Sequence, residues 1–226
     1  MADWFIATEG VKVVKDSASL WPQIITAVSS AGAALGGVYL AHYFTRRREE
    51  RAAAAKQVSE RLFIATELVF LLEQFAEDCA RVATDKGEPD QQGEYSPAVK
   101  PPELTVLNVS GDWRTLPSLI MYRVRELPVL QSEARRDIAV ASAHSWAPYH
   151  KEVFQERQYQ YARLGLKAII LSRRLRKLVH LPGSRLDATK WSAQPALWQV
   201  WRQERHRRAR EYIPARNRGV LNKGKP

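Results

Sequence analysis

The most constraining feature of this sequence is an uncharged run of 25 residues, 20–44, that contains no Asp, Glu, Lys or Arg. A bilayer core is crossed by about 20 predominantly apolar residues in an α-helix. The run is long enough for this, although it includes polar side chains such as Gln23 and Ser29. Trp21 and Tyr43 stand near its ends, as aromatic side chains do at membrane interfaces. We predict that residues 20–44 form a transmembrane helix.

Two other interpretations of this run are a cleaved signal peptide and a buried helix. A signal peptide would begin with a short basic region, whereas residues 1–19 carry acidic as well as basic side chains. A helix buried in a water-soluble protein is disfavoured because no polar face interrupts the run. An uncleaved anchor is the interpretation that fits best.

The charges on either side of the run predict its orientation. Four arginines follow it closely, namely Arg46, Arg47, Arg48 and Arg51. Lys12 and Lys15 are the lysines that precede it. Because cationic loops stay in the cytoplasm, residues 1–19 are expected outside the cytoplasm and the bulk of the chain inside it.

A small-residue pattern inside the run predicts contact between two such helices. Gly32 and Gly36 form a GxxxG pattern, which Ser29, Ala33 and Gly37 extend. Small side chains let helix backbones approach closely in a membrane. The pattern therefore indicates a possible homodimer through the span.

After the arginines, residues 45–84 are rich in helix-forming side chains and contain no Pro or Gly. Apolar or small residues recur every four and three positions, as in a coiled-coil seam. The predicted seam positions are Val58, Leu62, Ala65, Val69, Leu72, Ala76, Cys79 and Ala83. This helix should continue from the span and pack in a bundle.

Two further helical regions follow a Pro- and Gly-rich loop at residues 86–111. In the first, Asp112 is expected to cap a short helix that breaks into a second at Pro128. The second runs from about 148 to 179, and Arg157 is the exception among its apolar seam positions. We expect Arg157 to pair with a carboxylate or to mark register. The predicted fold is all-α: an antiparallel three-helix bundle over residues 45–183 with a basic C-terminal helix or tail.

Residues 184–226 form a basic tail. The last 54 residues hold 15 of the 35 Lys and Arg side chains but 3 of the 24 Asp and Glu side chains, so they carry a charge of about +12 while the first 172 residues are near −1. The candidate residues for an anionic surface or a nucleic acid are Trp198, Trp201, Arg202, Arg205, Arg207, Arg208 and Arg210. Arginines would meet phosphates and tryptophans would stack on bases or enter headgroups. The alternatives are a protein partner and a capping helix with solvated arginines.

No motif in the sequence indicates catalysis. The chain lacks a phosphate-binding GxxxxGK[ST] loop and the HExxH metal motif. Glu73 and Glu77 are expected on a solvated helix face, His144 and His150 are not spaced as a metal pair on one helix, and Cys79 is expected in the core. No catalytic residue, cofactor or metal ligand is predicted.

The segments FAEDCARVATDKGEPD and GDWRTLPSLIMYRVRELP give the chain a resemblance to an uncharacterised group of proteobacterial and prophage membrane proteins. These proteins have one N-terminal span and a helical body, over the equivalent of residues 20–180. The resemblance implies a bacterial inner-membrane setting and assigns no activity. The expected function is a non-catalytic single-span scaffold or adaptor whose basic tail meets an anionic surface or partner. The alternatives are a membrane-tethered nucleic-acid-binding protein and, third, an enzyme.

Overall fold

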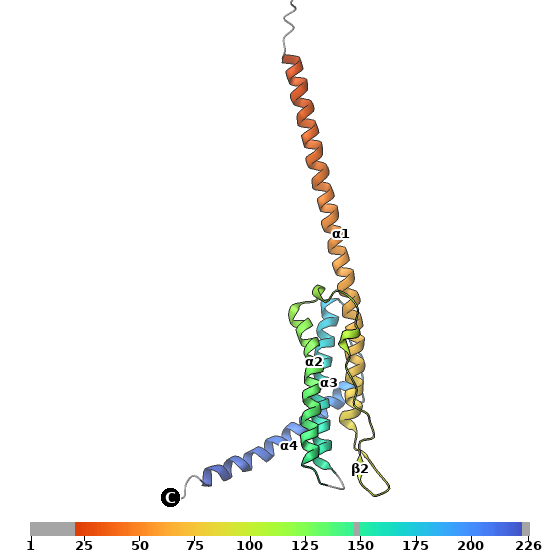
Figure 1. Cartoon of the computed structure of the whole chain (residues 1–226), viewed down its shortest axis with the longest axis vertical. Coiled ribbons are helices and arrows are strands. Elements are labelled where there is room, and N and C mark those ends of the chain that lie inside the picture. Colours follow the sequence, from red (N-terminus) through yellow and green to blue (C-terminus); the bar gives the residue numbers. More distant parts are fainter. Residues whose placement is uncertain (1–20, 147–149, 223–226) are drawn as a thin grey trace, which may run out of the picture. The chain divides into compact units, whose positions relative to one another are not determined.

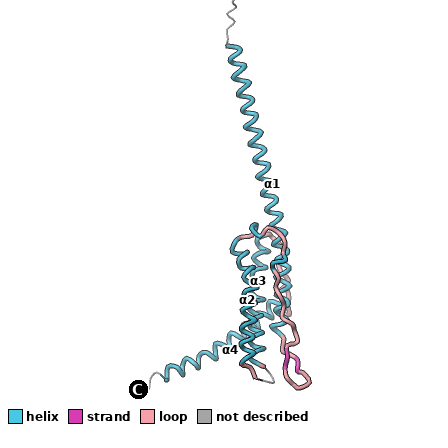
Figure 2. Tube along the Cα trace, in the orientation of Figure 1, coloured by secondary structure: helices cyan, strands magenta, loops and turns pink. Residues whose placement is uncertain are grey.

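The computed structural model describes the backbone of residues 21–146 and 150–222, and the side chains of residues 36–210 apart from 107 and 147–149. Its elements are almost all helical (Figures 1 and 2). The chain divides into two compact units, Met1–Ala54 and Ala55–Pro226, and each is described separately below.

Four long helices, two short 3-10 helices and two very short strands make up the regular structure of the described residues. The strands pair antiparallel, with Glu88 opposite Ser96 and Pro89 opposite Tyr95. In chain order the elements are α1 (Trp21–Thr84), β1 (Glu88–Pro89), β2 (Tyr95–Ser96), the 3-10 helices η1 (Val106–Asn108) and η2 (Trp113–Thr115), α2 (Ser118–Ala143), α3 (Lys151–Leu178) and α4 (Ala193–Asn222).

The first unit contains the N-terminal part of α1, which is helical from Trp21 onward as the sequence predicted. The structure describes the backbone of the predicted transmembrane helix from Trp21 onward, but the side chains of residues 21–35 lie outside the described residues. Within the part that is described, no helix has a stretch both long enough and apolar enough to cross a bilayer. The membrane span therefore stays a prediction from the sequence.

The core of the second unit confirms most of the seam predicted on α1. The seam positions from Ala65 to Ala83 are buried at 0–1% exposure. Val58 and Leu62 were predicted in the same seam but are 62% and 43% exposed. The reason is that the packed part of α1 begins at Ile64, so the apolar face of the helix continues beyond its neighbours.

The helices of the bundle do not all alternate in direction. Arg176 of α3 pairs with Glu73, and Arg157 near the start of α3 pairs with Asp85, so α3 runs antiparallel to α1. Residues 85–117 return along the bundle (Figure 1), and Arg61 of α1 reaches the carbonyl of Thr115 just before α2. Consequently α2 starts beside Arg61 and runs parallel to α1. The prediction of an antiparallel bundle is correct for α3 and wrong for the α1–α2 pair.

The returning segment is held by its own buried side chains and by α2. Leu104 and Val106 are buried in the core, and Gln131 of α2 accepts a hydrogen bond from the backbone N–H of Leu104 at 3.2 Å. Gln131 also donates to the carbonyl of Pro102. Burying both ends of this amide in satisfied hydrogen bonds avoids the cost of an unpaired polar group. The segment is therefore a packed part of the domain.

Helix α2 differs from the prediction at both Asp112 and Pro128. Asp112 caps the 3-10 helix η2, where it accepts a hydrogen bond from the backbone N–H of Arg114, and α2 begins later, at Ser118. Pro128 lies inside one continuous helix and does not break it. Proline inside a helix costs about 3 kcal/mol, yet α2 continues past Pro128, with Val124 and Leu127 buried before it and Ala134 buried after it.

Helix α4 packs against α3 through a close contact at Gly165. A Cβ added to Gly165 would lie 2.7 Å from Cδ1 of Leu197 and 3.0 Å from Cβ of Cys79. Leu197 is fully buried and Ala193 nearly so. Glycine at this position thus lets α4 close the bundle. The backbone of α4 stays helical to Asn222.

Candidate functional site

Two tryptophans and two arginines on α4 form an aromatic–basic face, which consists of Trp198, Trp201, Arg202 and Arg205. The two indole rings are stacked, with centroids 4.9 Å apart and planes 16° from parallel. Arg202 lies over the ring of Trp198 at 5.0 Å, and Arg205 lies over that of Trp201 at 4.9 Å. Both arginines are exposed. The helix spacing explains this order, because residues four apart meet on one face.

The geometry of this face suits the recognition of oxyanions. A guanidinium resting on an indole is held by a cation–π interaction, which is worth about 0.5–1 kcal/mol at an exposed site. Its N–H donors keep a fixed fork geometry that matches phosphate or carboxylate. Trp198 is 42% exposed and Trp201 is partly buried. The face therefore offers aromatic surface and two charge donors together.

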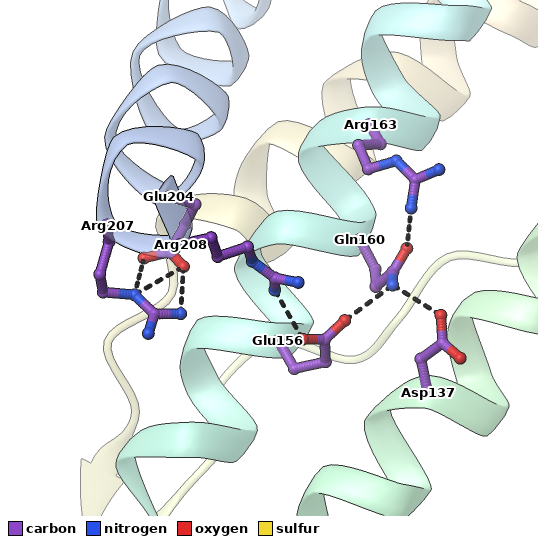
Figure 3. A network of polar contacts seen from close by, with 7 residues as sticks. All are labelled: Asp137, Glu156, Gln160, Arg163, Glu204, Arg207 and Arg208. Atoms are coloured by element: carbon purple, nitrogen blue, oxygen red, sulfur yellow. Dashed lines mark hydrogen bonds and ion pairs between the residues drawn. The ribbon is translucent and has the colours of Figure 1, made fainter. Parts of the chain in front are cut away.

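Arg207 and Arg208 do not belong to this face, contrary to the prediction. Figure 3 shows both in polar contacts within the protein. Arg207 donates to Oε2 of Glu204 at 2.7 Å, and Arg208 donates to Oε2 of Glu156 on α3 at 2.6 Å. Arg208 also lies 3.8 Å above the ring centroid of Tyr159. Their charges are thus partly neutralised, while Arg210 is exposed.

Glu156 links three helices in this network. Its Oε1 accepts a hydrogen bond from Gln160 at 2.7 Å, and Gln160 also donates to Asp137 of α2 at 2.7 Å (Figure 3). The Oε1 of Gln160 in turn accepts a bond from Arg163 at 3.0 Å. Helix α4 is consequently fixed to α2 and α3 by charge as well as by Leu197. This side of α4 packs on the bundle as a capping helix would, but Arg207 and Arg208 are paired and not solvated as that alternative expected.

The residues predicted at the membrane anchor lie in two groups. Ser29, Gly32 and Ala33 lie outside the described side chains. Gly36 and Gly37 are described, and an added Cβ at either would meet nothing within 4 Å. The helix surface at these two glycines is therefore open to another helix or to lipid.

The arginines after the predicted span are all exposed: Arg46, Arg47, Arg48 and Arg51. Arg46 pairs with Glu50 at 2.9 Å, and Arg47 lies 4.9 Å over the ring of Tyr43. Neighbouring apolar side chains are exposed as well, with Tyr39 at 71% and Phe44 at 61%. This short segment combines uncovered aromatic rings with cations, a combination that is common at bilayer interfaces.

Two ion pairs join α1 and the residue after its end to α3; the Arg157–Asp85 pair is buried and the Arg176–Glu73 pair is half-buried. Arg157 donates to Asp85, which confirms the predicted carboxylate partner of Arg157. Arg176 grips both carboxylate oxygens of Glu73 at 2.7 and 2.9 Å, and Ser172 donates to the same group at 2.6 Å. The prediction that Glu73 is solvated is therefore wrong. Its i, i+4 spacing with Glu77 gave no signal of a partner on another helix.

The carboxylates of both pairs are acidified by their surroundings. Burial alone would raise the pKa of Asp85, but hydrogen bonds from the backbone of Gly87 and Val99 and from Arg157 outweigh it and lower the pKa. Burial likewise acts to raise the pKa of Glu73, and hydrogen bonds from Arg176 and Ser172 lower it overall. Both groups are thus held ionised in the folded protein.

A line of three polar side chains crosses from the β-hairpin to the connection between α2 and α3. The Oγ of Ser145 lies 2.6 Å from Nδ1 of His150, and Nε2 of His150 lies 2.6 Å from Oε1 of Glu94. Serine, histidine and carboxylate also form the triads of hydrolases. Here His150 starts α3 in a left-handed conformation, at φ 42°, and the three contacts tie that turn to the hairpin. We infer a structural role for this line.

Burial of Cys79 is confirmed, and desolvation raises the pKa of its thiol well above the usual value. Among the residues with described side chains, no three His, Cys, Asp or Glu groups gather closely enough to hold a metal ion.

No family model matches the chain, and neither a curated protein nor a solved structure matches it. The resemblance to bacterial single-span proteins therefore stays a prediction.

Proposed function

We propose that this protein is a non-catalytic scaffold or adaptor, held at a bacterial inner membrane by residues 20–44, with its helical bundle in the cytoplasm. The observation that carries the proposal is the continuity of α1, which is helical from Trp21 to Thr84. One element thus contains both the uncharged run and the first helix of the bundle core. The exposed aromatic side chains before Arg46 support a lipid neighbour for this part of α1.

The bundle supplies the contact surface of this scaffold. The aromatic–basic face of α4 is proposed to meet an anionic surface or partner, because its two arginines are exposed and its indoles are preorganised. Anionic lipid headgroups attract such cations with about 1 kcal/mol per charge. The network at Glu156 holds α4 in place while this face remains accessible.

Self-association through α1 is part of the same proposal. Gly36 and Gly37 have open space beside them, and Val58 and Leu62 leave the predicted seam uncovered. A second copy of the chain would supply the missing partner at both places. Burial of apolar side chains such as these contributes about 25 cal/mol per Å².

Reporter fusions after Pro226 test the topology. Fused at that position, a reporter that works in the cytoplasm should be active, and a reporter that works only in the periplasm should be inactive. Fusions within residues 1–19 should give the opposite pattern. Activity of the periplasmic reporter after Pro226 would reverse the orientation, and cytoplasmic activity at both ends would remove the single span.

A second candidate is a membrane-tethered protein that binds nucleic acid. It is favoured by the pairing of stacked Trp198 and Trp201 with Arg202 and Arg205, since bases stack on aromatic rings and phosphates attract arginine. Phosphate contacts would make binding fall steeply as salt rises from 50 to 200 mM, roughly as a power of the salt concentration. Absence of DNA or RNA binding at low salt would exclude this candidate.

A further inference from the structure

Two hollows adjoin at the end of the bundle where α1 finishes and α3 begins. One, of about 570 Å³, lies between the last turns of α1 and the first turns of α4. The other, of about 630 Å³, lies beside the β-hairpin and the first turns of α3. Lys86 and Gln158 line both, so the hollows share a wall and form one double groove. No residue of this groove was predicted as a site from the sequence.

Each hollow has a highly exposed tryptophan on its wall. Trp191 lines the first and is 83% exposed, and Trp146 lines the second and is 85% exposed. Leaving an indole in water forfeits the stabilisation that burial of its large apolar surface would give. Aromatic side chains that are uncovered beside a concave surface are typical anchors for a binding partner.

The floor and the rim of the groove differ in chemistry. Alanines from α1 and α4 form much of the floor of the first hollow, and their small size leaves the space open: Ala80, Ala83, Ala193 and Ala196. Phe154 lines the second hollow. The rim carries Lys86, Lys151 and Lys190; within the described residues none of them forms an ion pair, and Lys190 lies 5.1 Å over the ring of Trp191. The groove therefore combines apolar surface with available positive charge.

Two carboxylates, Glu77 and Glu152, also line the groove, one in each hollow. Arg81 lies in the first hollow and is paired with Asp78 outside it. Lysines still outnumber the carboxylates, and Lys86 lies on the wall that the hollows share. The charges that line the groove therefore favour an acidic ligand that contacts Lys86.

Glutamine side chains on the walls of the groove favour a peptide over other anionic ligands. Gln155 lines the second hollow, and Gln199 and Gln203 line the first; none of the three amides has a hydrogen-bond partner among the described residues. Gln158 donates to the carbonyl of Asp85 at 2.7 Å, which leaves its oxygen available. Amides offer both donors and acceptors, as the backbone of a peptide requires. A flat bilayer surface would not enter a concave groove.

We propose that this double groove binds an extended, acidic peptide segment of a partner protein, with apolar side chains of that segment against Trp146 and Trp191. This site is separate from the aromatic–basic face of α4 and does not depend on it. It would give the scaffold a specific protein partner. Peptide affinity would come from the aromatic anchors, and selection for acidic sequences from the lysines.

Fluorescence anisotropy of labelled eight-residue peptides tests this proposal with the full-length chain in phosphatidylcholine nanodiscs. In one peptide, glutamate and aspartate alternate with leucine and phenylalanine; in the other, lysine replaces every acidic residue. The acidic peptide should bind at least about tenfold more tightly than the basic one. If the full-length chain stays in solution without lipid, peptide binding is measured in buffer instead. The result therefore does not depend on whether residues 20–44 cross a membrane.

The double variant Lys86→Glu/Lys190→Glu should weaken binding of the acidic peptide about tenfold. The matched control is Lys100→Glu/Lys177→Glu, which makes the same charge change at exposed positions outside the groove and should bind as the wild type does. Trp191→Ala should also weaken binding, with far-UV circular dichroism confirming the fold.

Three results would overturn the proposal. They are equal binding of the two peptides, equal loss in the groove and control variants, and no peptide binding at all. Vesicles containing phosphatidylglycerol provide the remaining comparison. If the groove variant binds these vesicles more weakly but binds the acidic peptide as the wild type does, the groove contacts lipid and the peptide assignment is wrong.

Discussion

The guanidinium of Arg157 donates a 2.7 Å hydrogen bond from Nη1 to Oδ2 of Asp85, and the two side chains are 4% and 2% exposed. The same carboxylate accepts hydrogen bonds from the backbone N–H groups of Gly87 and Val99. Arg157 also donates to the carbonyl of Val99. One ion pair thus joins the end of α1, the returning segment and α3.

The first prediction concerns this pair. Arg157→Met should lower the free energy of unfolding by about 3–5 kcal/mol, because it leaves Asp85 charged, buried and without its cationic partner. Chemical denaturation followed by tryptophan fluorescence in mild detergent measures the change. The control Arg174→Met removes an exposed arginine from the same helix and should change stability by less than about 0.5 kcal/mol. Similar losses in both variants would contradict the account of Asp85.

The second prediction concerns acid. The pKa values of Asp85 and Glu73 are lowered in the folded chain, so the unfolded chain binds more protons as the pH falls. Their contribution to stability is therefore complete above the unfolded values of about 3.9 and 4.3 and is lost below them. Unfolding free energies should be level from pH 7 to pH 5 and decline below about pH 4. Glu73→Gln should make the acid decline shallower, and an unchanged slope would argue against the linkage.

The third prediction tests how α4 docks. Gly165→Ala should destabilise the bundle by about 1–3 kcal/mol, since the added Cβ would overlap Leu197. Gly183→Ala is the matched control, because its Cβ would enter open space. Thermal unfolding of the two variants measures the difference. Equal melting temperatures would mean that α4 does not pack on α3 as described.

The sequence predicted the seam of α3 and most of that of α1, because burial of every third or fourth residue leaves a periodic pattern. It did not predict that α2 runs parallel to α1, since direction depends on the path of residues 85–117 and not on periodicity. The partner of Glu73 lies 103 residues away, at Arg176. Contacts at that separation have no local signature. For the same reason the double groove, built from five segments, was not predicted.

The sequence identified the candidate residues on α4 but could not show which side chain each arginine contacts. Arginines at 202, 205, 207 and 208 look equivalent in the sequence. The structure separates them, because Glu156 of α3 and Glu204 lie within reach of Arg208 and Arg207, whereas Arg202 and Arg205 face tryptophans. In this basic run, two arginines form ion pairs within the protein and two are exposed to a binding partner.

The fourth prediction tests self-association along α1. Val58→Cys should form a disulfide-linked dimer under mild oxidation, because Val58 lies on the uncovered part of the seam. The native Cys79 is fully buried and should not react. Ser59→Cys, also exposed but on another face of the helix, should cross-link much less. Equal cross-linking at both positions, measured by non-reducing electrophoresis, would contradict a dimer through this seam.

The fifth prediction concerns Ser145. If its contact with His150 is structural, Ser145→Ala should cost about 0.5–1.5 kcal/mol of stability. The wild-type chain should not react with a fluorophosphonate probe. Labelling of the wild type that disappears in Ser145→Ala would show an activated serine and restore the enzyme hypothesis.

The central claim is that residues 20–44 hold the chain in a membrane, and cell fractionation tests it most directly. The full-length chain should sediment with membranes, resist extraction by alkaline carbonate and be released by detergent. A chain that begins at Ala55 should stay in the supernatant. Recovery of the full-length chain as a monodisperse species in the supernatant, after a high-speed spin without detergent, would contradict the account.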